Sequence, residues 1–154
     1  MSITDYLSAT DVILDLEAPN KRTVLQLLAT EAANRLGRPE SEILGALQAR
    51  ERLGSTALGH GVALPHAQIE GKPVPVVLFA RIGRPLDFEA RDEELVDLVI
   101  LVLWPEASPE GFLPTLSDTC RSLRDEQVRQ KLRAAKTPEE VLTLLASPSP
   151  EARP

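Results

Sequence analysis

The sequence predicts an α/β sandwich, in which helices pack on a single sheet. Apolar side chains recur at helical spacing in the first and last thirds of the chain. Between these regions lie two segments rich in Val, Leu and Ile, residues 74–81 and 95–104, which have the length and composition of strands. The run at 99–103 is continuously apolar, which is typical of a central strand covered on both faces. The order helices, strands, helices therefore favours layers around one sheet.

The first third is predicted to hold a short strand at 12–16 and two helices. Asn20 follows the turn at 18–20 and can cap the first helix, because its side-chain oxygen accepts from free backbone amides. Gly37 stands where a left-handed C-cap would fall, and Pro39 suits the first turn of the second helix. The apolar positions of the two helices are Val24, Leu25, Leu27, Leu28, Ala32, Ala33 and Leu36, then Ile43, Leu44, Leu47 and Leu53.

The middle of the chain changes character between residues 54 and 71. This segment holds four of the eight glycines and both histidines. Residues 62–64 are read as a short strand ending at Pro65-His66, and residues 83–88 as the connection between the two long strands. The segment is therefore expected to be mostly loop around a short strand.

The last third is predicted to be helical at 111–123, at about 125–135, and again from Thr137. Thr137 can cap the last helix, with Pro138 and acidic side chains in its first turn. The Ser-Pro repeat after Ala146 cannot hold regular structure. We expect one folded domain over residues 1–147 and a flexible tail at 148–154.

Composition limits the classes of partner. The chain has 17 basic and 23 acidic residues, a formal net charge of −6, and no basic cluster. This argues against nucleic acid or an anionic membrane as the main partner, because both are bound through basic surfaces. No segment is apolar enough for membrane insertion, and the N-terminus lacks the basic residues of a signal peptide. The single cysteine, Cys120, is expected as a free, partly buried thiol in a helix, and it suits a cytoplasmic location.

The segment from Arg50 to His66 carries the residue types of an anion site. Dense glycines let backbone amides approach a ligand, Ser55 and Thr56 add hydroxyl donors, and Arg50 can supply charge. A neutral imidazole is a nucleophile through one ring nitrogen when a hydrogen bond fixes the other, so His66 suits phosphoryl chemistry. The same composition is also that of an ordinary loop beside a histidine, and the residues alone leave both interpretations open.

Other chemistries fit less well. The segment lacks the Gly-Lys-Ser/Thr ending of a P-loop, and its glycines precede the strand instead of following it as in dinucleotide-binding folds. His60, His66 and Glu70 match no zinc spacing, so no metal is expected. A nucleophilic Ser55 would need a Gly-x-Ser-x-Gly elbow, which is absent from the sequence.

The segment resembles the active-site motif of the enzyme IIA domains of the bacterial phosphotransferase system, in the fructose/mannitol and nitrogen-regulatory group. That motif has an Arg-Glu pair, a Gly/Ser-Thr-Gly step and a Gly-x-Gly-[Ile/Val]-Ala-[Ile/Leu]-Pro-His run. The matching residues here are Arg50-Glu51, Gly54-Ser55-Thr56 and the run from Gly59 to His66. The order of elements also agrees, and residues 113–117 look like the start of a late family helix. As a stand-alone chain, it is most similar to the nitrogen-regulatory enzyme IIA.

The resemblance implies a single α/β domain with a mixed central sheet flanked by helices on both sides. It implies that His66 accepts a phosphoryl group, through Nε2, from an HPr-like donor, and that regulatory target proteins are the further partners. Neither a cofactor nor a metal is implied, and a homodimer is an assembly that the sequence allows. By position, the supporting or phosphate-binding residues would be Arg50, Ser55, Thr56, Gly59 and Gly61.

The chain departs from the family pattern at three places. Ala57 and Ala67 stand where glycines are usual. Many members have a second histidine in the late helix, but the matching region here holds Phe112 and Pro114. Three arginines are candidates to compensate for its absence, namely Arg81, Arg84 and Arg121. This departure keeps a second hypothesis open, a regulatory binding module whose phosphotransfer is weak or lost. A sugar-specific fructose or mannitol component is a third hypothesis.

Overall fold

The computed structural model describes residues 3–71 and 73–146, so the predicted tail at 148–154 lies outside the described residues. Two short 3₁₀ turns, Ile3–Asp5 and Ala9–Asp11, precede the first strand. The strands are β1 (Val12–Leu16), β2 (Ala57–Gly59), β3 (Val62–Ala63), β4 (His66–Ile69), β5 (Val76–Leu86) and β6 (Val96–Pro105). The helices are α1 (Lys21–Leu36), α2 (Glu40–Arg52), α3 (Phe112–Leu123), α4 (Glu126–Ala134) and α5 (Pro138–Ala146).

The six strands form one mixed sheet in the order β1-β5-β6-β3-β2, with β4 also paired to β6. β5 and β6 are antiparallel, as are β2 and β3, whereas β1 runs parallel to β5. β3 and β4 lie one after the other along the same side of β6, both parallel to it, with Val62 opposite Leu98 and His66 opposite Val102. The chain therefore reaches His66 along the flank of the central strand.

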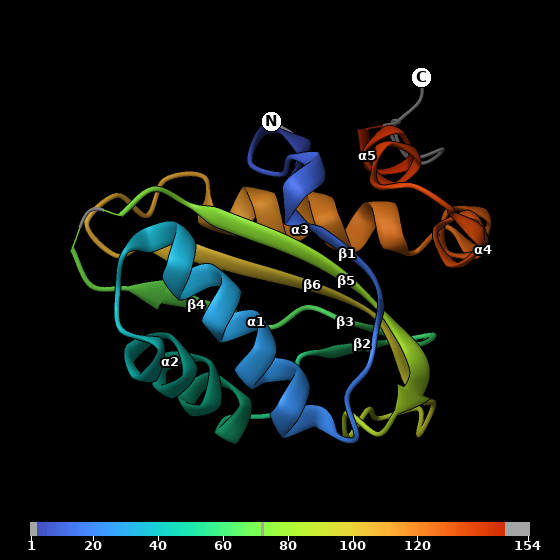
Figure 1. Cartoon of the computed structure of the whole chain (residues 1–154), viewed down its shortest axis with the longest axis horizontal. Coiled ribbons are helices and arrows are strands. Elements are labelled where there is room, and N and C mark those ends of the chain that lie inside the picture. Colours follow the sequence, from blue (N-terminus) through green and yellow to red (C-terminus); the bar gives the residue numbers. More distant parts are fainter. Residues whose placement is uncertain (1–2, 72, 147–154) are drawn as a thin grey trace.

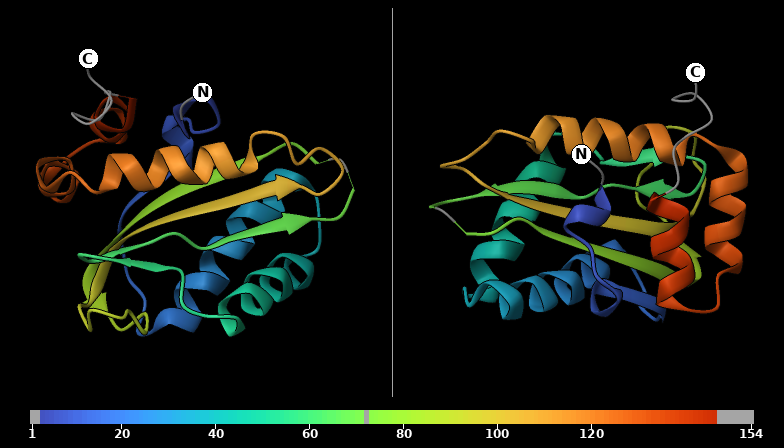
Figure 2. Two further views of the ribbon diagram at one scale, coloured as in Figure 1. Left: turned by 180° about the vertical axis from the view of Figure 1, so that it is seen from behind. Right: turned by 90° about the horizontal axis from the view of Figure 1, so that it is seen from above.

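Helices cover both faces of the sheet, as predicted. α1 and α2 lie on one face, and α3, α4, α5 and the N-terminal 3₁₀ turns lie on the other (Figures 1 and 2). Alternate side chains of the long strands divide between two cores: Leu78 and Leu101 pack toward α1 and α2, and Phe79 and Ile100 pack toward the other layer. This double coverage explains why the run at 99–103 is continuously apolar.

The predicted helix ends are largely confirmed. The Asn20 side-chain oxygen accepts from the Thr23 amide at 2.9 Å, and Gly37 ends α1 with a left-handed φ of 64°. The Thr137 hydroxyl oxygen accepts from the Glu140 amide at 3.2 Å. Pro39 is the residue before α2 and not part of its first turn, because its ψ of 136° is still extended.

Two strand predictions were wrong. β5 continues to Leu86 and so includes most of the expected connection at 83–88. Pro85 is tolerated there because the register shifts between Arg81 and Leu86, where the ladder does not require its missing N–H. His66 does not end the strand that begins at Val62. It begins a separate strand, β4, after a break at Leu64 and Pro65.

No helix among residues 3–71 and 73–146 combines the length and apolar character needed to cross a membrane. Cys120 lies in α3 as a half-buried free thiol, as predicted, and burial raises its pKa.

Candidate functional site

His66 is placed by the sheet itself. Ala67 and Ile69 of β4 belong to the core under α1 and α2, so the alternation of a strand directs His66 to the opposite face, where α3 lies. The ladder is held just before it, where the Val102 amide donates to the Pro65 carbonyl at 2.9 Å. The imidazole is half-buried. It therefore stands on a rigid element with part of its surface open.

Hydrogen bonds fix the form of the imidazole. Its Nδ1 lies 2.8 Å from the Leu64 carbonyl oxygen, and Nε of Arg50 lies 3.3 Å from Nε2. A carbonyl oxygen can only accept, so Nδ1 carries the proton and donates. Nε2 then holds a lone pair that accepts from the Arg50 guanidinium. The unprotonated nitrogen of the imidazole and the Arg50 cation are therefore in contact.

The surroundings of His66 favour its neutral form. Burial is the largest influence and lowers the pKa of the imidazole; the positive charge of Arg50 acts in the same direction. The hydrogen bond to Leu64 and the negative charge of Glu51 oppose this, and the net pKa is below the ordinary value of 6.5. At neutral pH the imidazole therefore remains uncharged and keeps its lone pair.

Arg50 reaches the histidine from the last turn of α2. Its Nη1 donates to the Gly54 carbonyl at 2.9 Å, which ties the side chain to the loop that follows the helix. A surface hollow of about 430 Å³ opens beside the pair, lined by α2, by β4 and by Phe112. Phe112, the first residue of α3, packs its ring against the imidazole with centroids 6.0 Å apart and planes at 61°.

Ser55 and Thr56 use their hydroxyl groups inside the protein. The Thr56 side chain is buried and bonds to the Glu51 carboxylate, which also accepts from the Thr56 amide at 3.3 Å and pairs with Lys21 at 2.8 Å. The Ser55 hydroxyl donates to the Phe88 carbonyl at 2.6 Å. These contacts tie the loop after α2 to α1 and to the 87–95 loop, so they hold the end of α2 from which Arg50 extends.

Gly59 and Gly61 lie in the hairpin between β2 and β3. Their φ values are 93° and 81°, and His60 between them has a φ of 56°, so all three have left-handed backbone. A Cβ on Gly59 would be 3.0 Å from Asp92, and one on Gly61 would overlap the Arg133 guanidinium. The glycines are thus required by the tight turn and its close neighbours. The structure brings Arg50 and His66 into contact, and it places these two glycines in a separate turn.

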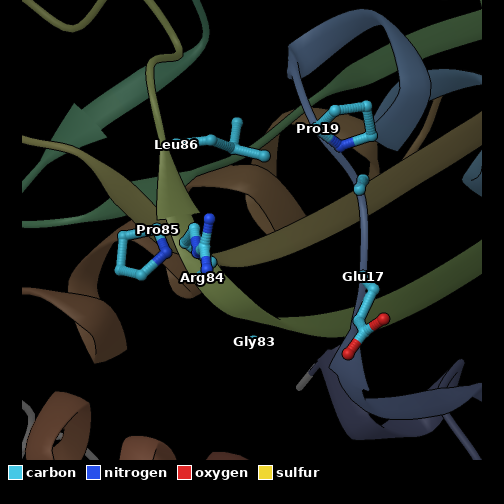
Figure 3. A pocket seen from close by; sticks show the side chains of 7 residues that line it. Glu17, Pro19, Gly83, Arg84, Pro85 and Leu86 are labelled. Atoms are coloured by element: carbon cyan, nitrogen blue, oxygen red, sulfur yellow. The ribbon is translucent and has the colours of Figure 1, made fainter.

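The three arginines considered as replacements for a second histidine have other surroundings. Arg81 donates to the carbonyls of Leu132, Arg133 and Ala135 at the end of α4. Arg121 pairs with Asp118 at 3.9 Å. Arg84 lines a hollow of about 660 Å³ with residues 17–19 and 83–86, where β5 passes the end of β1 (Figure 3). None of the contacts described for these arginines joins them to His66.

His60, His66 and Glu70, whose spacing fits no zinc site, do not come together as a group in the described residues. In the described part of the chain, the group of His and acidic side chains close enough for an ion is His60, Asp92 and Glu94, all exposed. It includes neither His66 nor Glu70.

Sequence reasoning did not assign site roles to three groups: the Leu64 carbonyl, the Glu51 carboxylate and the Phe112 ring. Glu51 could have been found from its place beside Arg50 in the motif. The strand β4 had a signal too, because residues 66–69 alternate between polar and apolar. The Leu64 carbonyl had none, since any residue supplies one.

Comparison with known proteins identifies relatives of this chain. Residues 5–147 match the family model "Phosphoenolpyruvate-dependent sugar phosphotransferase system, EIIA 2". A nitrogen regulatory protein of Bradyrhizobium diazoefficiens is 39% identical over 148 residues, covering 96% of this chain and 97% of that protein. A fructose-specific EIIA component of Haloferax volcanii is 34% identical over 151 residues, covering 95% and 97%.

Among solved structures, the nitrogen regulatory protein IIA-Ntr from Neisseria meningitidis superposes with a TM-score of 0.90. It is 29% identical, and the match covers 94% of this chain and 99% of that one.

Proposed function

We propose that this chain is a phosphocarrier of the nitrogen-regulatory kind. The premise is its family: the chain belongs to the EIIA type-2 family of the phosphoenolpyruvate-dependent sugar phosphotransferase system. His66 is the phosphoryl acceptor, and Nε2 is the atom that receives the group. The donor is an HPr-like phosphocarrier, and the phosphorylation state of His66 governs binding to regulatory target proteins. Such an exchange takes place in the cytoplasm.

The observation that carries this proposal is the pair of bonds on the imidazole. Leu64 accepts at Nδ1 and leaves Nε2 as the unprotonated nitrogen, while Arg50 stands at Nε2. A site that accepts a phosphoryl group needs a neutral nucleophile and a positive charge for the incoming oxygens. Both are present before any ligand arrives, so little rearrangement is required.

The transfer follows from these positions. The Nε2 lone pair forms a bond to phosphorus as the nitrogen–phosphorus bond of the donor phosphohistidine breaks, and that electron pair returns to the donor nitrogen. The Nδ1 proton stays in its bond to Leu64. The Arg50 guanidinium moves its contact from Nε2 to the phosphoryl oxygens, where charge is concentrated.

One observation favours a second candidate, a binding module with weakened phosphotransfer. The ring that faces His66 from α3 belongs to Phe112, which offers no hydrogen bond to a phosphoryl group. The 34% identity to a fructose-specific component likewise keeps a sugar-specific role as a third candidate.

Labelling separates the first two candidates. The protein is incubated with enzyme I, HPr and labelled phosphoenolpyruvate, next to His66→Gln and the matched control His60→Gln. The phosphocarrier should take up acid-labile label, His60→Gln should match it, and His66→Gln should take up none. Charged HPr that leaves the wild-type protein unlabelled would overturn the proposal and favour the binding module.

A further inference from the structure

Three of the five aromatic side chains of this protein form a continuous line that ends on His66. Tyr6, beside the N-terminal 3₁₀ turn, packs edge-on against Trp104 with centroids 5.0 Å apart. Trp104, at the end of β6, lies 6.1 Å from Phe112, and Phe112 lies 6.0 Å from the imidazole of His66. In a chain with few aromatic residues, this line is the largest concentration of ring surface near the site.

Trp104, the middle ring of this line, is fixed in the core. Trp104 is 3% exposed, and its indole N–H donates to the Ser108 carbonyl at 3.0 Å. Phe112 begins α3 directly after the loop that contains Ser108, so the loop and the buried indole together fix where its ring lies. The ring against His66 is therefore backed by the core.

The imidazole of His66 has two kinds of contact: hydrogen bonds at its nitrogens and the packing of an aromatic ring. Leu64 and Arg50 bind the two nitrogens at the ring edge, whereas Phe112 packs against the ring from α3. Hydrogen bonds at the edge restrain the direction of the nitrogens, and an apolar neighbour limits the tilt of the ring and excludes water from that side. Neither group can replace the other.

We propose that Phe112 is a positioning residue for phosphoryl transfer, an inference that rests on the acceptor role proposed above for His66. The Phe112 ring holds the imidazole with Nε2 toward Arg50 and shields the phosphohistidine from water. Hydrolysis of that intermediate requires a water oxygen to bond to phosphorus while the Nε2–P bond breaks and its electron pair returns to Nε2. The products are neutral imidazole and inorganic phosphate. Apolar cover beside the imidazole slows this step without blocking a protein donor.

Phe112 packs against the imidazole, and burial of the imidazole lowers the pKa of His66. The charged groups that act on the imidazole are Arg50 and Glu51, both on α2, and both remain when Phe112 is replaced. Removing the ring admits water, so the pKa of His66 should rise toward its ordinary value. At pH 6 more of the imidazole is then protonated, and acceptance of phosphate should fall at pH 6 relative to pH 8.

The test uses the full chain with Phe112→Ala, and with Phe112→Leu as the conservative variant that restores apolar cover. Each protein is phosphorylated with phosphoramidate, a small chemical donor, and the half-life of the phosphohistidine is measured after the donor is removed. The titration of His66 is followed by NMR, with the second histidine, His60, as the internal reference. Phe79→Leu, a buried change elsewhere on the same face of the sheet, controls for general loss of stability.

Phe112→Ala should shorten the half-life by about two- to tenfold, the range that one aromatic pair contributes, and should move the His66 titration to higher pH. Phe112→Leu should recover most of both effects, and Phe79→Leu should change neither. An unchanged half-life and titration in Phe112→Ala would overturn this inference. Phosphorylation of the wild-type protein by phosphoramidate but not by charged HPr would overturn the proposed function. The half-life of the phosphohistidine and the titration of His66 would still test the role of Phe112.

Discussion

At the scale of single residues, the site is defined by what binds each nitrogen of His66. The Leu64 carbonyl selects the tautomer, and the Arg50 guanidinium lies at Nε2, where the proposed phosphoryl group would bind. Burial keeps the imidazole neutral, so the nucleophile is available at neutral pH. Arg50 contributes twice, because its charge lowers the pKa of His66 and also suits the oxygens of an incoming phosphoryl group.

Replacing Arg50 tests this double contribution. Arg50→Met should slow phosphoryl acceptance at saturating donor by about 10²-fold, the loss typical of removing one donor to developing charge. The pKa of His66 should rise, because the guanidinium charge lowers it. A quenched time course of labelling measures the rate of phosphoryl acceptance, and NMR titration measures the pKa of His66.

Arg52→Met is the matched control, since Arg52 lies two residues further along α2, carries the same charge and is exposed. It should keep the wild-type rate. Equal losses in the two variants would mean that net charge, and not the contact with Nε2, is responsible.

At the scale of elements, the site depends on how one segment changes direction twice. The hairpin of β2 and β3 turns at residues 59–61, and the chain then breaks at Leu64 and Pro65 before β4. Gly61 makes the first turn possible: its carbonyl accepts from the amides of Asp97 and Leu98, and its missing Cβ leaves room for Arg133. A change in the backbone conformation of this turn would shift β3, and with it the start of β4, along β6.

Two glycine substitutions should therefore have opposite effects on the free energy of unfolding. Gly61→Ala should lower it by more than about 1 kcal/mol, because the φ of 81° is strained for alanine and its Cβ meets Arg133. Gly45→Ala, inside α2 with nothing within 4 Å of the new Cβ, should raise it by about 0.5–1 kcal/mol. Urea unfolding measures both, and a destabilised Gly45→Ala or a neutral Gly61→Ala would contradict this interpretation.

At the scale of the whole molecule, the two helical layers meet the edge of the sheet at His66. α2 comes from one face and the start of α3 from the other, and each presents an exposed leucine there. Leu53 is 84% exposed beside the hollow, and Leu113 is 69% exposed next to Phe112. If an HPr-like donor docks over His66 as proposed, these two side chains lie where it would make contact.

Polar replacements of these leucines should weaken binding of the donor. Leu53→Ser and Leu113→Ser should each raise the HPr concentration at half-maximal labelling by about fivefold, equivalent to about 1 kcal/mol. The labelling rate at saturation should change little, because a leucine side chain offers no polar group to either nitrogen of the imidazole. Leu95→Ser is the control: Leu95 is 55% exposed, but it precedes the end of β6 remote from Val102. A similar weakening in Leu95→Ser would show that the effect is not local to His66.

Much of the fold could be predicted because its signals are local. The caps at Asn20 and Thr137, the end of α1 at Gly37 and the apolar run of β6 each depend on a few neighbouring residues, and the structure confirms them. The extent of β5 could not be predicted in this way. Pro85 suggests a loop, and only pairing with a neighbouring strand across a register shift makes that segment a strand.

For the candidate site, the sequence by itself predicted the residues proposed for the chemistry, His66 and Arg50, because the ordered motif that contains them is local. The tertiary structure alone decided which contacts they make. It joined Arg50 to Nε2 across two elements, directed Ser55 and Thr56 to the protein interior, and set Phe112 against the imidazole. The physical reason is that a side chain's chemistry is set by its own residue type, whereas its protonation, partners and exposure depend on groups brought near by the packing of distant segments.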